Sequence, residues 1–250
     1  MIYLRFEAGG RARYGLLEGN SAAEISKSYF GSFKKTGKKF SLSKLKLLAP
    51  CKPSKIIAMG LNYVEHAREL KMPLPLAPLF FLKAPSAAIG PGDTIVSPAV
   101  SKRVEYEGEL AVVIGKKAKD VTAAKAKEYI LGYTCFNDVT ARDLQRVDGQ
   151  WARSKSFDTF APLGPWIAGG IDADNLRIET FVNGRRKQGS NTCGLLFKVD
   201  EIVSYVSRMM TLMPGDLIAT GTPPGVGPLK HGDRVEVKIQ KIGTLSNDVI

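Results

Sequence analysis

The sequence predicts a mainly β protein with short helices, in the α+β class. Gly-Asp turns recur at residues 92–93, 215–216 and 232–233, and strand-like residues follow each of them. The Asn-Gly pair at 183–184 favours a tight β-hairpin. Segments with the helical spacing of apolar residues are fewer, and they lie at 123–130, 140–145 and 200–210.

The first fifty residues predict a small β module. Apolar and polar residues alternate over 2–7 and 12–17, on either side of two glycines, which predicts a hairpin. Two prolines then come directly before the apolar run at 55–60, and such prolines favour a linker. We therefore place a domain boundary there, with a small N-terminal module at 1–52 and the main domain at 53–250.

The main domain is expected to begin with a strand and a short helix. The apolar run at 55–60 predicts a buried strand, and Asn62 is placed to cap a helix over 62–70. Three prolines within 72–78 exclude a regular helix or a central strand, so this segment is expected to be a loop. Residues 79–82 predict another buried strand.

Composition narrows the class of protein. Of the 250 residues, 44% are hydrophobic, which is enough to fill a core. Cys51, Cys135 and Cys193 lie far apart without C-x-x-C spacing, so neither a disulfide framework nor a zinc knuckle is indicated. No segment reaches the ~20 apolar residues of a membrane span, and the N-terminus lacks the apolar core of a signal peptide. We expect a cytoplasmic protein with no membrane partner.

The net charge of +12 raises the question of nucleic-acid binding. Lysines crowd residues 34–46, but no recognised nucleic-acid motif accompanies them. A solvated basic face is favoured, so nucleic acid is not expected as a partner. The same charge would attract a small anionic substrate. The alternative is a non-catalytic module that binds nucleic acid or small anions in a salt-sensitive, Mg²⁺-independent way.

Acidic residues alternate at Glu105, Glu107 and Glu109, directly before the apolar run at 110–114. On a strand they share one face, and residues two apart lie roughly 7 Å apart, so long side chains can converge on a cation. A carboxylate at the edge of a core is costly unless it is paired or coordinated. An exposed strand face is the alternative interpretation of these acids.

A further acid, Asp138, follows an apolar strand predicted over 130–136. Asp138, Arg142 and Gln145 are spaced four and three apart, so one helical face would present a carboxylate, a guanidinium and an amide. The alternative is a helix N-cap with an ion pair between positions four apart.

His66 and Glu69 are three apart on the helix predicted over 62–70. The carboxylate would orient the imidazole and raise its basicity, which is the arrangement of a general base. A surface pair without function is the alternative. His231, the other histidine, lies in a turn and is expected to be incidental. The glycine-rich loop 221–227 lacks the G-K-[ST] ending of a P-loop.

Five motifs, in order, resemble those of the fumarylacetoacetate hydrolase family. They are G-x-N-Y-x-x-H-x-x-E at 60–69, E-x-E-L at 107–110, N-D-V-T-A-R-D-x-Q at 137–145, K-S-F-D at 155–158 and G-T-P-x-G-V-G at 221–227. The resemblance runs from about Lys55 to the C-terminus. It implies a mixed β-sandwich roll, a homodimer and a divalent metal, usually Mg²⁺, with Mn²⁺ or Ca²⁺ as alternatives.

The resemblance also implies which acids hold the metal. The ligands would be Glu107, Glu109 and Asp138, and Glu105 would be a residue of the rim. Three carboxylates leave positions for water and for substrate oxygens. The sequence departs from the family at Cys193, where a methionine is expected.

The resemblance implies further roles around this metal. His66, oriented by Glu69, would activate a water molecule, and Lys155 would stabilise charge on the substrate. The residues implied to hold the substrate are Arg142, Gln145 and Thr222, the last of which would meet its carboxylate.

The implied function is Mg²⁺-dependent hydrolysis of a C–C bond in an acylpyruvate- or fumarylpyruvate-type 1,3-diketo acid, as in aromatic-compound catabolism. The histidine-glutamate pair favours hydrolysis, because decarboxylation and tautomerisation need no activated water. The alternatives on the same site are isomerisation of a 2-hydroxymuconate-type dienoate and decarboxylation of a 2-oxo acid such as oxaloacetate. The loop after Leu70 would close over bound substrate as a lid.

Overall fold

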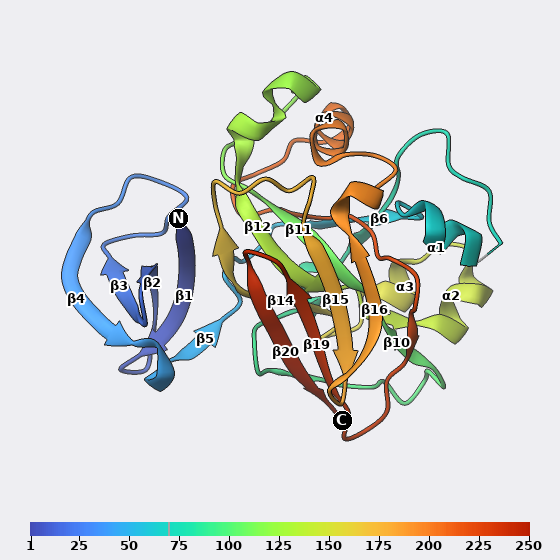
Figure 1. Ribbon diagram of the computed structural model, residues 1–250, viewed down its shortest axis with the longest axis horizontal. Helices are drawn as coiled ribbons and strands as arrows, with labels where there is room; N and C mark the ends of the chain where they lie inside the picture. The colour runs from blue at the N-terminus through green and yellow to red at the C-terminus, as the bar shows by residue number, and fades with distance from the viewer. Residues whose placement is uncertain (70) are drawn as a thin grey trace.

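The computed structural model describes residues 1–69 and 71–250, and strands outnumber helices in this part of the chain, which confirms the mainly β class (Figure 1). The strands form one large sheet and two smaller ones. The large sheet runs, in spatial order, through β4 (Lys35–Ser41), β3 (Ser21–Ile25), β2 (Arg11–Glu18), β1 (Ile2–Ala8), β14 (Ala161–Ala168), β12 (Ile130–Asn137), β11 (Gly108–Ile114), β17 (Leu217–Ala219), β6 (Ile56–Gly60) and β7 (Leu79–Lys83), with β5 (Lys46–Leu48) paired to β1 and β8 (Ala88–Ile89) paired to β14.

The two smaller sheets complete the fold. The five-stranded sheet contains β16 (Arg185–Asn191), β15 (Arg177–Val182), β19 (Arg234–Ile239), β20 (Gly243–Val249) and β9 (Thr94–Ile95). The three-stranded sheet contains β13 (Thr140–Ala141), β10 (Val104–Tyr106) and β18 (Gly227–Pro228). The Asn-Gly pair at 183–184 joins β15 to β16, and the three Gly-Asp turns precede β9, β17 and β19, as predicted.

The N-terminal strands form a lobe beside the larger body, at the left in Figure 1. This lobe is joined to the main sheet by backbone pairing, because Ile2 and Tyr3 of β1 lie opposite Ala168 and Ile167 of β14. The lysines of 34–46 lie on or near its outer strand β4, whose residues are almost all exposed. The predicted boundary between 1–52 and 53–250 stays a prediction.

The core lies on both faces of β11. Leu110, Val112 and Ile114 belong to a cluster shared with β15, β19 and the helix α4 (Val199–Met209), whereas Ala111 and Val113 belong to the cluster on the opposite face. Each fully buried Leu, Val or Ile contributes roughly 1.5–3 kcal/mol of hydrophobic stabilisation. β11 is therefore a rigid central strand. Glu109 lies near its start, and Glu107 directly precedes it.

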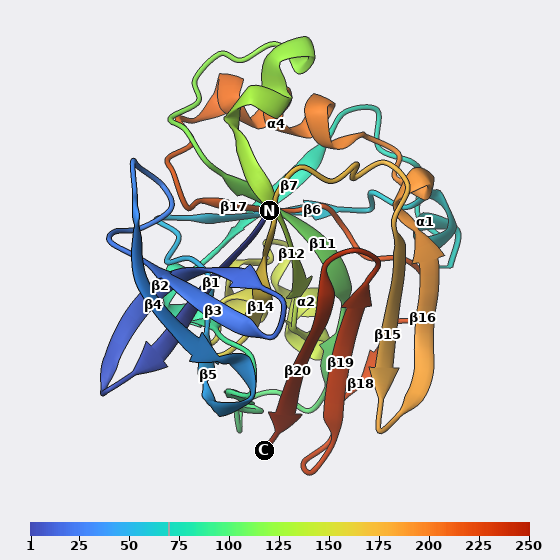
Figure 2. The same cartoon turned by 60° about the vertical axis from the view of Figure 1, so that its left-hand side comes forward.

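Helices are short and lie at the ends of the strands. They are α1 (Val64–Glu69), α2 (Arg142–Asp148), α3 (Ala152–Lys155), α4 (Val199–Met209) and the 3₁₀ turns η1 (Leu42–Lys44), η2 (Pro85–Ala87), η3 (Ala123–Tyr129) and η4 (Thr192–Gly194). Figure 2 shows α4 across one end of the sheets, where it packs against η3. Its apolar stripe is buried as predicted at Ile202, Val203 and Val206, but Met209 at the last turn is exposed.

Two local predictions were wrong. Asn62 does not serve as the predicted helix cap: its side chain donates to the carbonyls of Thr220 (2.8 Å) and Phe197 (3.1 Å), so it ties the start of α1 to two distant loops. β7 is a strand but not a buried one, since Leu79 and Leu82 are 42% and 47% exposed. The reason is position, because β7 is the edge strand of the large sheet.

Other predictions agree with the fold. Residues 72–78 contain neither helix nor strand, as their prolines require. Leu70, the last residue of the predicted helix, lies outside the described residues. All three cysteines are free. In the described part of the chain, no helix is long and apolar enough to cross a membrane.

Asp216 fastens the start of β6 to the start of β17, and we predict a large stability effect for it. Its buried carboxylate accepts hydrogen bonds from Ser54 N (2.9 Å), Ser54 Oγ (2.7 Å) and Met213 N (2.7 Å), and it pairs with Lys55. Asp216→Ala should lower the free energy of unfolding in urea by about 3 kcal/mol, because buried partners are left unpaired. Asp248→Ala, which breaks an exposed pair, is the control and should cost about 0–1 kcal/mol. Equal effects of the two changes would contradict this explanation.

Candidate metal and substrate site

Three acids meet where β10, β11 and β12 come together. Glu107 lies between the end of β10 and the start of β11, and Glu109 is the second residue of β11. The antiparallel register places Gly108 opposite Asn137, so Asp138 follows directly beside Glu107. Two hydrogen bonds fix this junction: Asp138 N donates to Glu107 O (2.8 Å), and Glu107 N donates to Asn137 Oδ1 (2.9 Å).

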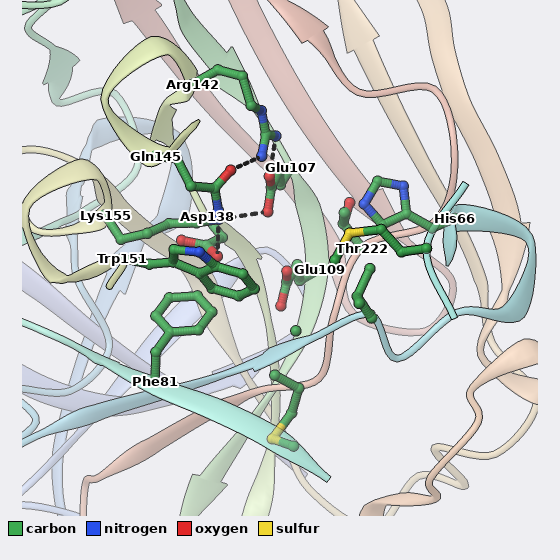
Figure 3. Close-up of a pocket in the computed structure, with 14 residues that line it drawn as sticks. His66, Phe81, Glu107, Glu109, Asp138, Arg142, Gln145, Trp151, Lys155 and Thr222 are labelled. Atoms are coloured by element: carbon green, nitrogen blue, oxygen red, sulfur yellow. Dashed lines mark hydrogen bonds and ion pairs between the residues drawn. The ribbon is translucent and has the colours of Figure 1, made fainter. Parts of the chain in front are cut away.

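The three carboxylates lie together in the interior (Figure 3). Glu107, Glu109 and Asp138 each offer an oxygen, and these oxygens lie within 4.8 Å of one another. All three residues are buried. Buried carboxylates this close repel one another strongly unless cations compensate them. The arrangement therefore calls for positive charge, from side chains, from a metal ion, or from both.

Two lysines supply part of that charge. Lys155 Nζ donates to Glu107 Oε2 (2.8 Å) and to Asp138 Oδ2 (2.6 Å). Burial opposes the charge on Lys155, but the carboxylates of Asp138 and Glu107 outweigh it and raise its pKa. Lys83, fully buried at the end of β7, pairs with the other oxygen of Asp138. Burial lowers the pKa of Lys83, and the Asp138 carboxylate opposes this shift.

Glu109 stands apart from the other two acids because no cationic side chain in the described chain pairs with it. Its Oε2 accepts a single backbone hydrogen bond, from Gly221 N at 2.8 Å. Burial, followed by the charges of Asp138 and Glu107, raises the pKa of Glu109 well above the usual range. By contrast, Lys155 and Arg142 overcome the effect of burial and lower the pKa of Glu107.

The residues present fit a hard divalent cation. Carboxylate oxygens are the ligands that Mg²⁺, Mn²⁺ and Ca²⁺ prefer. Glu109 offers a buried carboxyl group with no cationic partner among the described residues, and the oxygens of Glu107 and Asp138 keep a further lone pair beside their lysine and arginine partners.

The histidine-glutamate pair reaches the same cavity from α1. His66 Nδ1 lies 2.9 Å from Glu69 Oε2, and the His66 side chain is only 7% exposed, which is unlike a surface pair. Figure 3 shows His66 and Thr222 across the cavity from Arg142, Gln145 and Lys155. Because Nδ1 is bound to Glu69, Nε2 is the nitrogen left for a proton transfer.

The backbone of the glycine-rich loop 221–227 donates hydrogen bonds to carboxylates of the site. Gly221 N donates to the acid Glu109, and Gly225 N donates to Glu69 Oε1 at 3.0 Å. Thr222 Oγ1 donates to the carbonyl of Gly108 at 2.9 Å, so its proton is directed at the backbone. One loop thus connects the carboxylate cluster with the partner of His66, and its backbone N–H groups bind carboxylates and not a phosphate.

Gly225→Ala should disturb this connection. Gly225 has φ +99°, and a Cβ there would lie 2.4 Å from the carbonyl oxygen of Lys187. We expect turnover to fall about tenfold, a loss on the order of one hydrogen bond to a charged group, because the N–H that holds Glu69 must move. Gly232→Ala is the matched control, since it has φ +87° and no atom within 4 Å of its Cβ. Turnover that falls equally in both variants would rule out a role for the contact with Glu69.

Arg142 and Gln145 come from α2, but the predicted helical face with Asp138 does not exist. Thr140–Ala141 pair with β10 as strand β13, so α2 begins only at Arg142. Arg142 consequently pairs with Glu107 through Nη2, and its Nη1 donates to Gln145 Oε1.

The prediction that Glu105 is a rim residue was wrong. Glu105 is only 2% exposed. Its carboxylate accepts from Arg142 Nε at 2.7 Å and from Arg103 Nε at 2.5 Å.

Apolar residues form the remainder of the lining of this small cavity. They include Phe81 of β7 and Trp151, which meet edge-on with ring centroids 5.2 Å apart. Met72, the first residue of the proline-rich loop, also lines the cavity. Sequence reasoning missed Lys83, Phe81 and Trp151. The signal for Lys83 was a lysine at the end of an apolar strand.

A small cavity that combines a buried carboxylate cluster, paired lysines and a histidine-glutamate pair is typical of an enzyme that acts on a small molecule. The family model described as "Fumarylacetoacetate (FAA) hydrolase C-terminal" matches residues 55–250. A second model, described as "Rv2993c-like, N-terminal", matches residues 1–50. The chain belongs to the fumarylacetoacetate hydrolase family.

Named relatives carry out different reactions. A mitochondrial oxaloacetate tautomerase of Bos taurus is 44% identical over 221 residues, which cover 83% of this chain and 70% of the relative. The crystal structure of a 5-carboxymethyl-2-hydroxymuconate delta-isomerase from Mycobacterium smegmatis is 45% identical, with a TM-score of 0.95 over 100% of this chain and 99% of the other.

A third structure is that of maleylpyruvate hydrolase from Sphingobium sp. SYK-6 in complex with manganese(II) and pyruvate. It is 32% identical, with a TM-score of 0.83 over 100% of this chain and 99% of that one. The fold predicted for the family is therefore confirmed, together with its N-terminal module. The family is one of enzymes, and at least one member binds a divalent metal.

Proposed function

We propose that this protein is a metal-dependent hydrolase that cleaves a C–C bond in an acylpyruvate- or fumarylpyruvate-type 1,3-diketo acid. The observation that carries the proposal is the placement of the His66–Glu69 pair at the same cavity as Glu107, Glu109 and Asp138. A general base opposite a carboxylate cluster suits attack by water on a substrate held at that cluster.

The proposed ion is Mg²⁺, with Mn²⁺ able to replace it, and its ligands are Glu107, Glu109 and Asp138. The acidic cluster and the manganese complex of the related hydrolase support this proposal. Such an ion would act as a Lewis acid that polarises the 2-oxo group of the substrate.

The protein's own residues would then move the proton. His66 would take a proton from water at Nε2, while Glu69 holds Nδ1 and stabilises the imidazolium. The hydroxide would add to the distal carbonyl carbon, and the C–C bond would break with its electron pair on the pyruvyl carbon. Return of the proton from His66 to that carbon balances the reaction and gives pyruvate and a carboxylic acid. Lys155 would compensate the negative charge that develops.

The amide of Gln145 would orient the substrate. Thr222 would meet the substrate carboxylate only after its hydroxyl proton turns away from the carbonyl of Gly108. Gln145 turns its carbonyl oxygen toward Arg142, which leaves its NH₂ group for a substrate oxygen. The net charge of +12 would favour the approach of such an anion. We also propose a homodimer in the cytoplasm; light scattering would test the dimer.

A panel of substrates tests the reaction. Acetylpyruvate, fumarylpyruvate, oxaloacetate and a 2-hydroxymuconate analogue would each be offered with Mg²⁺ and with chelator. We expect Mg²⁺-dependent release of pyruvate from the diketo acids, followed with lactate dehydrogenase. Turnover of the diketo acids that persists in chelator would contradict a metal-dependent hydrolase.

Tautomerisation of oxaloacetate is the second candidate, favoured by the 44% identity to the bovine tautomerase. His66 would then carry a proton between C3 and the enol oxygen, and no water would add. Loss of the enol's ultraviolet absorbance without release of pyruvate would identify this reaction. The same panel tests the two remaining alternatives: the 2-hydroxymuconate analogue tests isomerisation of a dienoate, and release of pyruvate from oxaloacetate tests decarboxylation.

A further inference from the structure

We propose that Glu105 is a positioning residue which, through Arg142, sets the Glu107 carboxylate and the Gln145 amide in place. The inference rests on the proposed function only for its choice of probes. It concerns an acid that the family resemblance assigned to the rim.

Glu105 is built into the protein as a buried anion between two arginines. It lies on β10, paired in register with Thr140 of β13 and with Pro228 of β18. Its carboxylate receives Arg142 Nε at 2.7 Å and Arg103 Nε at 2.5 Å. The residue before β10 also holds the arginine's backbone in place, since Arg142 N donates to Arg103 O at 2.8 Å.

This contact fixes the plane of the Arg142 guanidinium. The guanidinium is planar, so a hydrogen bond at Nε also sets the directions of both terminal nitrogens. Nη2 reaches Glu107, and Nη1 donates to the carbonyl oxygen of Gln145. Within the described residues the Gln145 NH₂ group has no partner, and Gln145 lines the cavity. Arg142 also lines the cavity, and its hydrogen bond to the Gln145 carbonyl leaves the Gln145 NH₂ group for a substrate oxygen.

Glu105 also decides how strongly Arg142 competes for Glu107. With Glu105 present, the arginine's charge is shared between two carboxylates, and Arg103 supplies a second positive charge to Glu105. Without the charge of Glu105, Arg142 would be compensated by Glu107 alone. Arg142 would then compete more strongly with a bound cation for the Glu107 carboxylate, so the affinity of the cluster for that cation should fall.

Calorimetric titration of the metal-free protein with Mn²⁺ tests this inference. Glu105→Gln is nearly isosteric, and it should raise the Kd for Mn²⁺ about tenfold, as changes to groups that orient metal ligands do. Glu179→Gln is the matched control, because Glu179 also lies between two arginines, Arg177 (3.5 Å) and Arg186 (3.2 Å), but outside the cavity. The Kd of Glu179→Gln for Mn²⁺ should equal that of the wild type.

Two further measurements separate positioning from general destabilisation. The Kd of the Mn²⁺-loaded protein for pyruvate should rise in Glu105→Gln, because the Gln145 amide loses its orientation. Combining Glu105→Gln with Arg142→Met should bind Mn²⁺ no more weakly than Arg142→Met alone, since both changes act through one side chain. Should Glu105→Gln fail to fold, Glu105→Asp keeps the charge but shortens the side chain and so removes the contact with Arg142 Nε. Weaker pyruvate binding is then expected, and unchanged pyruvate binding would overturn the inference.

Unchanged Mn²⁺ and pyruvate affinities in the folded variant would overturn the inference, as would additive effects in the double variant. Because these are binding measurements, they stand even if every diketo acid fails as a substrate. Failure of the substrate panel would count against the proposed reaction and not against the role of Glu105.

Discussion

Glu109→Gln is expected to abolish the rise in melting temperature that Mg²⁺ or Mn²⁺ causes in the wild type. Turnover should fall by about a thousandfold, since a Lewis-acid metal supplies several kcal/mol of transition-state stabilisation. The amide keeps the size of Glu109 and an oxygen for Gly221 N, so the loss reports on charge. Differential scanning fluorimetry with and without metal measures the first effect, and assays with the preferred diketo acid measure the second.

The same change should make the metal-free protein more stable. The pKa of Glu109 is raised in the folded state by burial and by Asp138 and Glu107. An acid with a raised folded pKa stabilises the fold fully below its ordinary pKa, and this contribution is lost as pH rises through the folded value. In chelator, Glu109→Gln should therefore melt above the wild type at neutral pH, and the difference should shrink toward pH 4.5.

The informative result is that Glu109→Gln should change the melting temperature in opposite directions, relative to the wild type, with metal and in chelator. Glu107 contributes in the opposite direction, because its pKa is lowered and its stabilisation is lost in acid, but that contribution is common to both proteins. If the difference in melting temperature between wild type and Glu109→Gln were the same at every pH, the pKa of Glu109 would not be raised in the folded state.

His66→Ala should lower hydrolysis by about 10²- to 10⁴-fold, the usual contribution of a positioned general base. Mn²⁺ affinity should stay at the wild-type value, because His66 is paired with Glu69 and not with the carboxylate cluster. His231→Ala, on an exposed turn, is the matched control for loss of a histidine. Full hydrolysis by His66→Ala would remove the water-activation role and leave the metal assignment intact.

Much of the fold was predictable because its signals are local. Glycine-aspartate turns, the Asn-Gly hairpin and the apolar run at 110–114 depend on residues next to one another in sequence. Alternation along the sequence singled out Glu105, Glu107 and Glu109 together, and the family motif was needed to select Glu107 and Glu109 from the three. Asp138 could be added from the order of the family motifs.

The missing parts of the site depend on contacts between distant segments. Lys83 pairs with Asp138, which lies 55 residues further along the chain, and no residue near Lys83 in the sequence indicates this partner. The face predicted for Asp138, Arg142 and Gln145 failed because β10 draws Thr140–Ala141 into a sheet. Pairing between strands overrode helical spacing there, and it turned Arg142 toward Glu107 and Glu105.

The most direct test of the account is a crystal of this protein soaked with Mn²⁺ and pyruvate, with anomalous data collected for manganese. We predict one strong anomalous peak bounded by Glu107, Glu109 and Asp138, with pyruvate beside it and within reach of the Gln145 amide. A peak at any other place, or none at these three carboxylates, would contradict the account.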